Sequence, residues 1–343
     1  LACLCISILA IYGVTFNNLF IVFYWMVAFI SMAILLFRLV GAAFSPEKSN
    51  NRQYKPPQIA PIYTIMIALY RESGVVQDLL LALSKIEWPK HCLDIIFLCE
   101  ENDTPTINAL ANNKNICDFR ILVLPDGVPK TKPRALQIGL KFAKGQYITI
   151  YDAEDRPDSK QLLSAYNAFL NGDESLAIVQ APLIINNHKE SWIAGQFFLE
   201  YAMWFRVILP ALVRFSDFLP LGGTSNHFKT EILKEIGGWD AYNLTEDADL
   251  GVRLCRYGYK ATLISEPTYE EAPPKIAPWI KQRSRWIHGH MQTIGVHIRN
   301  PIKTFQEMGI RGSFAFIIGI MSGPLSASMR APFVFLMLFA FFE

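Results

Sequence analysis

The chain has 343 residues, of which 52% are hydrophobic and only 18% are charged. Soluble domains carry about 25% charged residues, so this composition indicates apolar segments in addition to an ordinary core. The formal net charge is only +2 and the sequence has no long run of Lys or Arg, which excludes a strongly basic nucleic-acid-binding surface.

The first predicted elements are transmembrane helices within residues 1–44. Residues 19–40 are apolar except for Arg38, and a helix of roughly 20 apolar residues crosses a bilayer core. Residues 1–14 are also apolar but too short, so we interpret them as the end of a truncated span. The alternative for residues 19–40 is a buried helix in a large soluble core.

Basic residues after the second apolar segment set its orientation; they are Arg38, Lys48, Arg52 and Lys55. By the positive-inside rule, residues 45–300 are expected in the cytosol, at an inner or cytoplasmic membrane. Residues 301–343 become apolar again and are predicted to form an interfacial or transmembrane segment. Because the sequence begins with Leu1 and ends in an apolar run, we expect a piece of a longer, multi-pass protein.

Residues 45–300 alternate between strand-like and helix-like stretches. The predicted strands are Tyr63–Ala68, Ile95–Cys99, Ile121–Leu124, Tyr147–Ile150 and Ala177–Gln180, and helices are predicted at Val75–Ile86 and Pro133–Ala143. This alternation predicts an α/β domain with a mostly parallel sheet, whose ligands bind at the carboxyl ends of the strands. The apolar stretch at about 192–214 is interrupted by Glu200, Arg206 and Pro210, which favours a helix lying in the membrane interface.

The fourth predicted strand runs into three carboxylates, Asp152, Glu154 and Asp155. Asp152 and Glu154 are two residues apart, so from extended backbone both point the same way and could bind one Mg²⁺ or Mn²⁺ ion. Such an ion would also bridge the phosphates of a nucleotide. The alternative is an acidic surface turn that ends at Pro157.

Two further motifs carry candidate chemistry. Glu246 and Asp247 precede a predicted helix at Ala248–Tyr257, where one carboxylate could act as general base, although acids also favour helix starts for electrostatic reasons. Gln282, Arg285 and Trp286 share one face of a later helix. The guanidinium suits a pyrophosphate and the indole a sugar ring, but Trp beside Arg is also common at membrane interfaces.

A weaker set of polar side chains follows the predicted strands and the interfacial stretch. The candidates for the donor are Glu72, Glu100, Lys132 and Arg134, and those for an acceptor are Thr224, Asn226 and His227. Each of these positions is also compatible with an ordinary polar loop, and a lone His is more often structural than catalytic.

The order DAED, GGTSNH, TED and QxxRW, flanked by apolar segments, resembles the processive family 2 glycosyltransferases of the cellulose synthase and curdlan synthase type. The resemblance covers about residues 60–300. It implies a GT-A fold, a nucleotide diphosphate-sugar donor, a divalent metal and inversion at the anomeric carbon. The resemblance further implies roles for the motif residues: Asp152 and Glu154 for diphosphate and metal, Asp247 as base, and Gln282, Arg285 and Trp286 for diphosphate and acceptor. Glu in place of the second Asp is a departure that puts the metal preference in doubt.

From this resemblance we expect a hexosyltransferase that moves a hexose, with UDP-glucose as the expected donor, to a growing β-glycan that is then exported. One alternative is transfer of a single sugar to a membrane lipid. Another is a catalytically silent membrane subunit that binds nucleotide sugars. The expected partners are the donor, a glycan or lipid-linked acceptor, membrane lipid, and export or accessory subunits.

Overall fold

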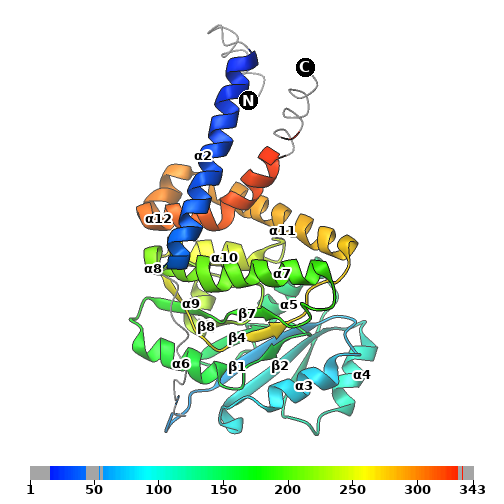
Figure 1. The fold of residues 1–343 in the computed structure, drawn as a ribbon. Coiled ribbons are helices and arrows are strands. Elements are labelled where there is room, and N and C mark those ends of the chain that lie inside the picture. The colour runs from blue at the N-terminus through cyan, green and yellow to red at the C-terminus, as the bar shows by residue number, and fades with distance from the viewer. Residues whose placement is uncertain (1–15, 44–53, 55–56, 331–333, 335–343) are drawn as a thin grey trace.

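The computed structural model describes residues 16–43, 54, 57–330 and 334. The predicted transmembrane helix lies within α2 (Phe16–Ala43), which is about 42 Å long at 1.5 Å per residue. Figure 1 shows α2 protruding from the body of the molecule on the side opposite the lower strands. The truncated span expected at residues 1–14 lies outside the described residues.

A seven-stranded mixed sheet forms the centre, in the order β3-β2-β1-β4-β8-β6-β9. Its strands are β1 (Tyr63–Leu69), β2 (Leu93–Glu100), β3 (Arg120–Leu124), β4 (Tyr147–Tyr151), β6 (Leu176–Gln180), β8 (Asn226–Lys229) and β9 (Lys260–Leu263). All five predicted strands are present, and β1 to β4 pair in parallel. β8, which was not predicted, pairs antiparallel with both β4 and β6.

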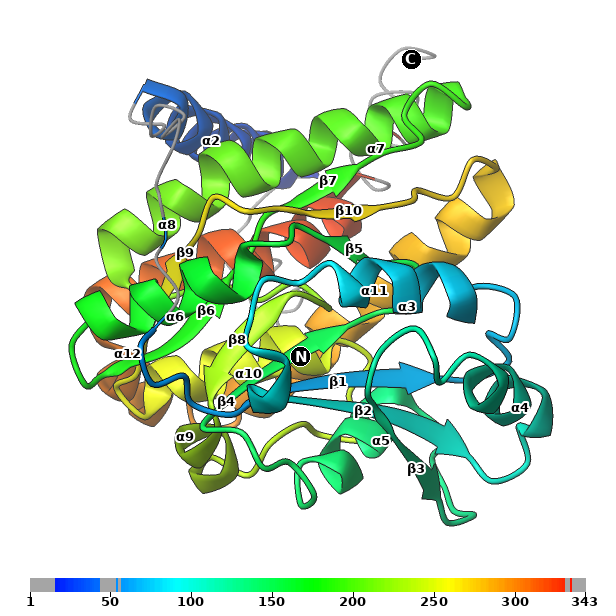
Figure 2. The same cartoon turned by 90° about the horizontal axis from the view of Figure 1, so that it is seen from below.

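The two faces of the sheet bury separate hydrophobic clusters because successive side chains of a strand point to opposite faces. In β1, Ile65 and Ile67 join one cluster and Met66 joins the other. The covering helices are α3 (Val76–Ser84), α4 (Thr104–Asn112) and α6 (Gln161–Asn171) on the first face, and α5 (Lys132–Gly139) on the second. Figure 2 shows α3 and α5 on opposite sides of β1 and β2.

Several helices lie between the sheet and the protruding α2, as Figure 1 shows for α7, α8 and α10. The remaining helical elements of the chain are α7 (Trp192–Met203), the π-helical turn η2 (Trp204–Ile208), α8 (Leu209–Ser216), α9 (Thr230–Glu235), α10 (Glu246–Arg256), α11 (Ile276–His297) and α12 (Pro301–Phe316). α12 continues through a π-helical turn η3 (Ile317–Met321). The helix predicted at about 192–214 is therefore present, and Pro210 lies directly after the π-helical turn, where the regular α-helical hydrogen bonding is interrupted.

Two helices among the described residues are long and apolar enough to cross a membrane, Trp192–Ser216 and Pro301–Arg330. Within the most apolar part of each, only about a third of the residues or fewer are buried inside the protein. Exposed apolar side chains on long helices fit contact with lipid. The interfacial position of the first helix, and the interfacial or transmembrane position of the second, stay predictions.

A small second sheet completes the domain. It consists of β5 (Arg156–Pro157), β10 (Thr268–Glu270) and β7 (Leu183–Ile185), in that order. β10 pairs antiparallel with β5 and parallel with β7. Because β5 follows the DAED turn directly, this sheet brings the residues around Glu270 beside the acidic end of β4.

Candidate active site

The site lies at the carboxyl ends of β1, β2 and β4, which are neighbouring parallel strands. Lys132 links its parts: its Nζ donates to the Asp152 carboxylate and, at 2.7 Å, to the carbonyl oxygen of Gly223. Lys132 is held at the start of α5, where Thr131 is the N-cap. Burial by itself lowers the pKa of Lys132. The negative charges of Asp152 and Glu246 outweigh this effect and raise the pKa above its usual value, so the ammonium stays charged.

The TED motif faces the same lysine from α10. This helix was predicted to begin at Ala248 but begins at Glu246, so both acids lie in its first turn. Burial raises the pKa of Asp247 to about 6. Burial and the neighbouring Asp247 raise the pKa of Glu246 as well, so the two acids titrate as a pair.

Asp247 also borders the glycine-rich loop. Its Oδ1 accepts from the backbone N–H of Ala248 at 2.8 Å, and a Cβ on Gly223 would lie 3.5 Å from its Oδ2. The structure thus brings together Asp152, Lys132, Glu246 and Asp247, which the sequence analysis placed on separate motifs. One lysine with three acidic side chains around it is suited to binding an anionic group and moving a proton beside it.

Asp155 fixes the turn after β4 from within the core. It is fully buried, and its Oδ2 accepts from the backbone N–H of Asp152 at 2.7 Å and from the hydroxyl of Thr224. Its Oδ1 has no hydrogen-bond partner in the described part of the chain. Burial and Asp152 raise the pKa of Asp155 to about 8.

The expected metal pair is Asp152 and Glu154. Partial desolvation and the charge of Asp152 raise the pKa of Glu154, so the two carboxylates are close enough to repel each other. Within the described residues, no group of three or more His, Cys, Asp or Glu has a geometry that could hold a metal ion. Two mutually repelling carboxylates fit a divalent ion if its remaining ligands come from a diphosphate.

Glu270, at the end of β10, belongs to the same acidic group and was missed by the sequence analysis. Burial raises its pKa well above the usual range, and the charges of Asp155 and Asp152 raise it further. No local motif marks this residue. Only the pairing of β10 with β5, in which Tyr269 lies opposite Arg156, brings it to the site.

The two acids expected to contact the nucleoside differ in their surroundings. The pKa of Glu72, after β1, is raised by burial and by Asp103, so this side chain lies near the acidic group. Glu100 is buried and accepts from Nη1 of Arg134 at 3.1 Å. This ion pair ties the end of β2 to α5, and it engages the arginine that was expected to neutralise phosphate.

The GGTSNH loop does not present its side chains as expected. Thr224, Asn226 and His227 were predicted to bind the acceptor, but each is at most 1% exposed. Thr224 donates to Asp155, and Asn226 Nδ2 donates to the carbonyl of Gly222 at 2.6 Å. We therefore correct their role: Asn226 and His227 support the site from within β8, which lies inside the sheet between β4 and β6, and Thr224 supports it through Asp155.

His227 shows the reason for this correction. Its Nδ1 lies 2.8 Å from the Tyr63 hydroxyl, and its Nε2 lies 3.2 Å from Oε1 of Gln161. Burial lowers its pKa to about 3. A neutral ring with both nitrogens engaged has no atom left for an acceptor, so His227 is a core residue.

The QxxRW face of α11 is built around an arginine that the sequence analysis passed over. The Arg283 guanidinium lies 4.6 Å from the ring centroid of Trp286 and 4.7 Å from that of Phe197. It also binds both carboxylate oxygens of Glu200 on α7, at 2.5 and 2.6 Å. Arg285, which was expected to bind the leaving group, is exposed, and its role stays a prediction.

Trp286 is half-buried in an aromatic cluster beside the second sheet. It packs with Trp279 and Tyr201 against Phe197, Ile185 at the end of β7, and Ala272, two residues after Glu270. Gln282 is half-buried, and its Oε1 has no hydrogen-bond partner among the described residues. A flat indole with an unpartnered amide near it, close to the acidic group, suits a sugar ring.

The sequence is similar to those of known glycosyltransferases. A family model described as glycosyl transferase family group 2 matches residues 147–342. The chain is 27% identical over 268 residues to the poly-β-1,6-N-acetyl-D-glucosamine synthase of Staphylococcus epidermidis, covering 76% of this chain and 63% of that protein. It is also 27% identical over 238 residues to the β-monoglucosyldiacylglycerol synthase of Trichormus variabilis, covering 68% and 49%.

Among solved structures, the chain resembles the mannosyltransferase PcManGT from Pyrobaculum calidifontis, whose structure is in complex with GDP-Man and Mn²⁺. The TM-score is 0.67 at 17% identity, covering 94% of this chain and 91% of that one. At this identity the likeness concerns the fold, and it confirms the expected GT-A-like α/β architecture. The chain spans between 49% and 63% of the lengths of the two curated relatives above.

Proposed function

The chain belongs to glycosyl transferase family group 2, and on this premise we propose that it is an inverting hexosyltransferase that extends a β-glycan at a membrane. The donor is a nucleotide diphosphate-sugar, with UDP-glucose as the expected one. The observation that carries the proposal is the convergence of Asp152, Lys132, Glu246 and Asp247 at the carboxyl ends of the parallel strands.

The first step we propose is binding of the donor diphosphate at Asp152, Glu154 and Lys132. A divalent ion held by the two carboxylates would supply positive charge to the leaving diphosphate when bound. Lys132 contributes its own charge beside Asp152, and its contact with the carbonyl of Gly223 fixes its direction. Positive charge placed before the reaction stabilises the charge that develops on the leaving group.

The second step is attack by the acceptor hydroxyl, with Asp247 as the general base. A carboxylate with a pKa of about 6 is ionised at neutral pH but is a stronger base than an ordinary Asp. Glu246 lies beside Asp247, and the charge of Lys132 favours the ionised form of both acids. The oxygen–hydrogen bond of the acceptor breaks toward Asp247 as the new glycosidic bond forms and the nucleoside diphosphate departs.

The acceptor is proposed to lie along Trp286 and Trp279, the two half-buried indoles that pack against Phe197. Aromatic faces of this kind hold successive sugar rings of a glycan. The long apolar helix Trp192–Ser216 carries Phe197 and supports a site beside lipid. Polymer synthesis is also the reaction named for the Staphylococcus relative.

A second candidate is transfer of one sugar to a membrane lipid, which the name of the Trichormus relative favours. Incubation of membranes containing the full-length protein with radiolabelled UDP-glucose, UDP-N-acetylglucosamine and GDP-mannose, followed by product sizing, distinguishes the two. We expect a polymer with one of these donors. A product that is a one-sugar lipid at every donor concentration supports the second candidate, and no transfer from any donor contradicts both.

A further inference from the structure

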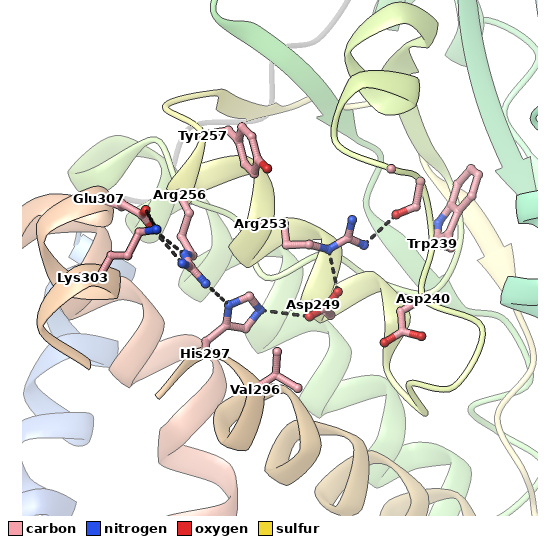
Figure 3. A pocket seen from close by; sticks show the side chains of 12 residues that line it. Trp239, Asp240, Asp249, Arg253, Arg256, Tyr257, Val296, His297, Lys303 and Glu307 are labelled. Atoms are coloured by element: carbon pink, nitrogen blue, oxygen red, sulfur yellow. Dashed lines mark hydrogen bonds and ion pairs between the residues drawn. The ribbon is translucent and has the colours of Figure 1, made fainter. Parts of the chain in front are cut away.

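A cavity of about 630 Å³ lies beside α10, away from the proposed base (Figure 3). Asp249, Arg253 and Arg256 of α10 line it, and the ends of α11 and α12 complete its wall. Asp247 and Asp249 are two residues apart in a helix, so their side chains point about 200° apart around its axis. The cavity and the active site therefore lie on different faces of the same helix.

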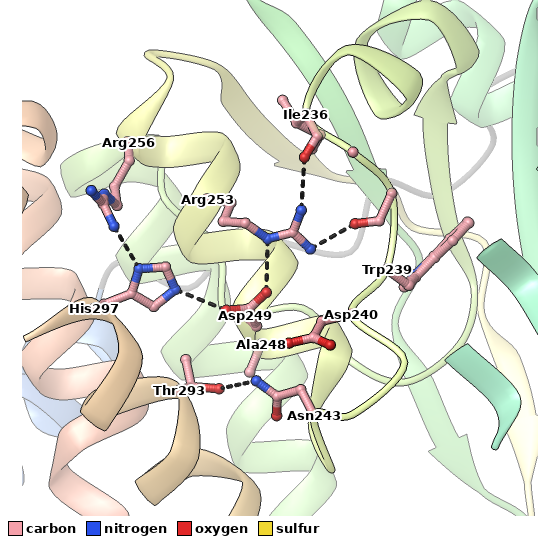
Figure 4. Close-up of polar contacts among 12 residues, drawn as sticks. Ile236, Trp239, Asp240, Asn243, Ala248, Asp249, Arg253, Arg256, Thr293 and His297 are labelled. Carbon is pink, nitrogen blue, oxygen red and sulfur yellow. Dashed lines mark hydrogen bonds and ion pairs between the residues drawn. The ribbon is translucent and has the colours of Figure 1, made fainter. Parts of the chain in front are cut away.

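Asp249 is the centre of a hydrogen-bond network along this wall (Figure 4). It is buried, and its Oδ2 accepts from Nε of Arg253 at 2.7 Å while its Oδ1 lies 2.9 Å from Nε2 of His297. The other nitrogen of His297, Nδ1, lies 2.9 Å from Nη1 of Arg256. Arg256 in turn pairs with Glu307 of α12 at 2.7 Å.

The partners of His297 determine its tautomer. A guanidinium has no acceptor, so Nδ1 of His297 must accept from Arg256, and Nε2 then carries the proton and donates to Asp249. A doubly protonated ring would direct a second N–H at the guanidinium. The imidazole of His297, which belongs to α11, thus bridges the carboxylate of Asp249 and the guanidinium of Arg256, both on α10.

α11 also holds the turn that precedes the proposed base. Nδ2 of Asn243 donates to the hydroxyl of Thr293 on α11 at 3.1 Å, and Oδ1 of Asn243 accepts from the N–H of Thr245 at 3.0 Å. A Cβ on Gly289 would lie only 2.5 Å from a side-chain carbon of Thr245. The N-terminus of α10 therefore rests directly on α11.

We propose that His297 is a positioning residue: through Asp249 it fixes α10 against α11 and so holds Asp247 in place for proton removal. On the face of α10 that borders the cavity, the hydrogen bonds of His297 add to the packing that holds this helix against α11. The proposal rests on the proposed function in which Asp247 is the base. His297 itself does not touch the reacting groups.

The experiment uses the full-length protein in membranes and whichever nucleotide sugar of the panel above gives turnover. His297→Leu removes both hydrogen bonds, whereas His297→Gln keeps one donor and one acceptor. Val296→Ala, which alters a neighbouring residue of the same cavity wall, is the matched control. We expect His297→Leu to lower kcat by about 10- to 100-fold, since misplacement of a reacting group by about 1 Å has such an effect.

The accompanying readouts separate positioning from general damage. The KM for the donor and the affinity for UDP or GDP should stay within about threefold in His297→Leu, and His297→Gln and Val296→Ala should keep kcat within about threefold of wild type. A kcat near wild type in His297→Leu overturns the proposal. Equal losses in His297→Leu and His297→Gln also overturn it, because the hydrogen bonds would then not be the cause.

If His297→Leu does not fold, His297→Asn takes its place, because its shorter amide cannot span both partners. We then expect His297→Asn to lose rate while His297→Gln keeps it, and equal rates for the two overturn the proposal. Asp247→Asn, measured alongside, distinguishes the two levels of inference. Activity in Asp247→Asn rejects the base itself, whereas an inactive Asp247→Asn with an unaffected His297→Leu rejects only the positioning role.

Discussion

Substitution of the Asp247 carboxylate by an amide tests the proposed base directly. Asp247→Asn keeps the side-chain size and an oxygen for the N–H of Ala248, which lies 2.8 Å from Oδ1, but it removes the proton acceptor. A general base contributes about 10²–10⁴-fold in rate, or about 2.7–5.4 kcal/mol in activation free energy. We expect kcat to fall within this range, while Lys132 and Asp152 still hold the donor.

The pH dependence gives a second measure of the same group. Burial raises the pKa of Asp247 to about 6, and the ionised form is the active one. Activity should therefore be lost as the pH falls through about 6 and be level above it. From pH 7 to pH 5 the ionised fraction falls from about 90% to about 10%, so kcat/KM should drop about tenfold.

Transfer of radiolabelled sugar, measured between pH 5 and pH 8, records both effects. Asp173→Asn is a suitable control, because it removes an exposed carboxylate that pairs with Lys260 away from the site. Near-normal turnover in Asp247→Asn, or a pH limb near 6 that persists in this variant, would refute the reasoning. Either result would direct attention to Glu246.

Three further changes test other parts of the site. Excess EDTA should abolish transfer and Mg²⁺ or Mn²⁺ should restore it, and Asp152→Ala should weaken nucleotide binding in calorimetry; full activity in EDTA contradicts a metal requirement. Thr224→Val removes one of the two donors to buried Asp155, so thermal unfolding should show a loss of about 1–3 kcal/mol that Thr224→Ser largely avoids. Trp286→Ala should shorten the polymer and spare donor hydrolysis, and unchanged product length would count against sugar stacking on this indole.

The strands could be predicted because their pattern is local. β1, β4 and β6 are short, almost continuous apolar runs, as expected of strands buried on both faces. β8 escaped prediction because Asn226 and His227 read as a polar loop. The side-chain partners of His227, Tyr63 and Gln161, lie far away in sequence, and no local pattern shows that a polar residue will be satisfied within a sheet.

The site residues also divide into those that the local sequence marks and those that depend on tertiary contacts. Asp152, Glu246 and Asp247 stand at element boundaries that the sequence marks, and the structure places them around Lys132. Glu270 and Arg283 depend on tertiary contacts, with β5 and with Glu200 of α7 respectively. The direction of a side chain in α11 is also invisible in the motif itself, which is why Arg285 was chosen and Arg283 overlooked.

The burial of the Gly222–His227 loop has a practical consequence for engineering. A library that varies Thr224, Asn226 and His227 to change the acceptor would alter buried residues that support the catalytic centre. Most members of such a library would misfold. The aromatic cluster on α7 and α11 offers partly exposed side chains instead. Diversity aimed at Trp279 and Trp286, with the loop left intact, is the more economical route to altered acceptor choice.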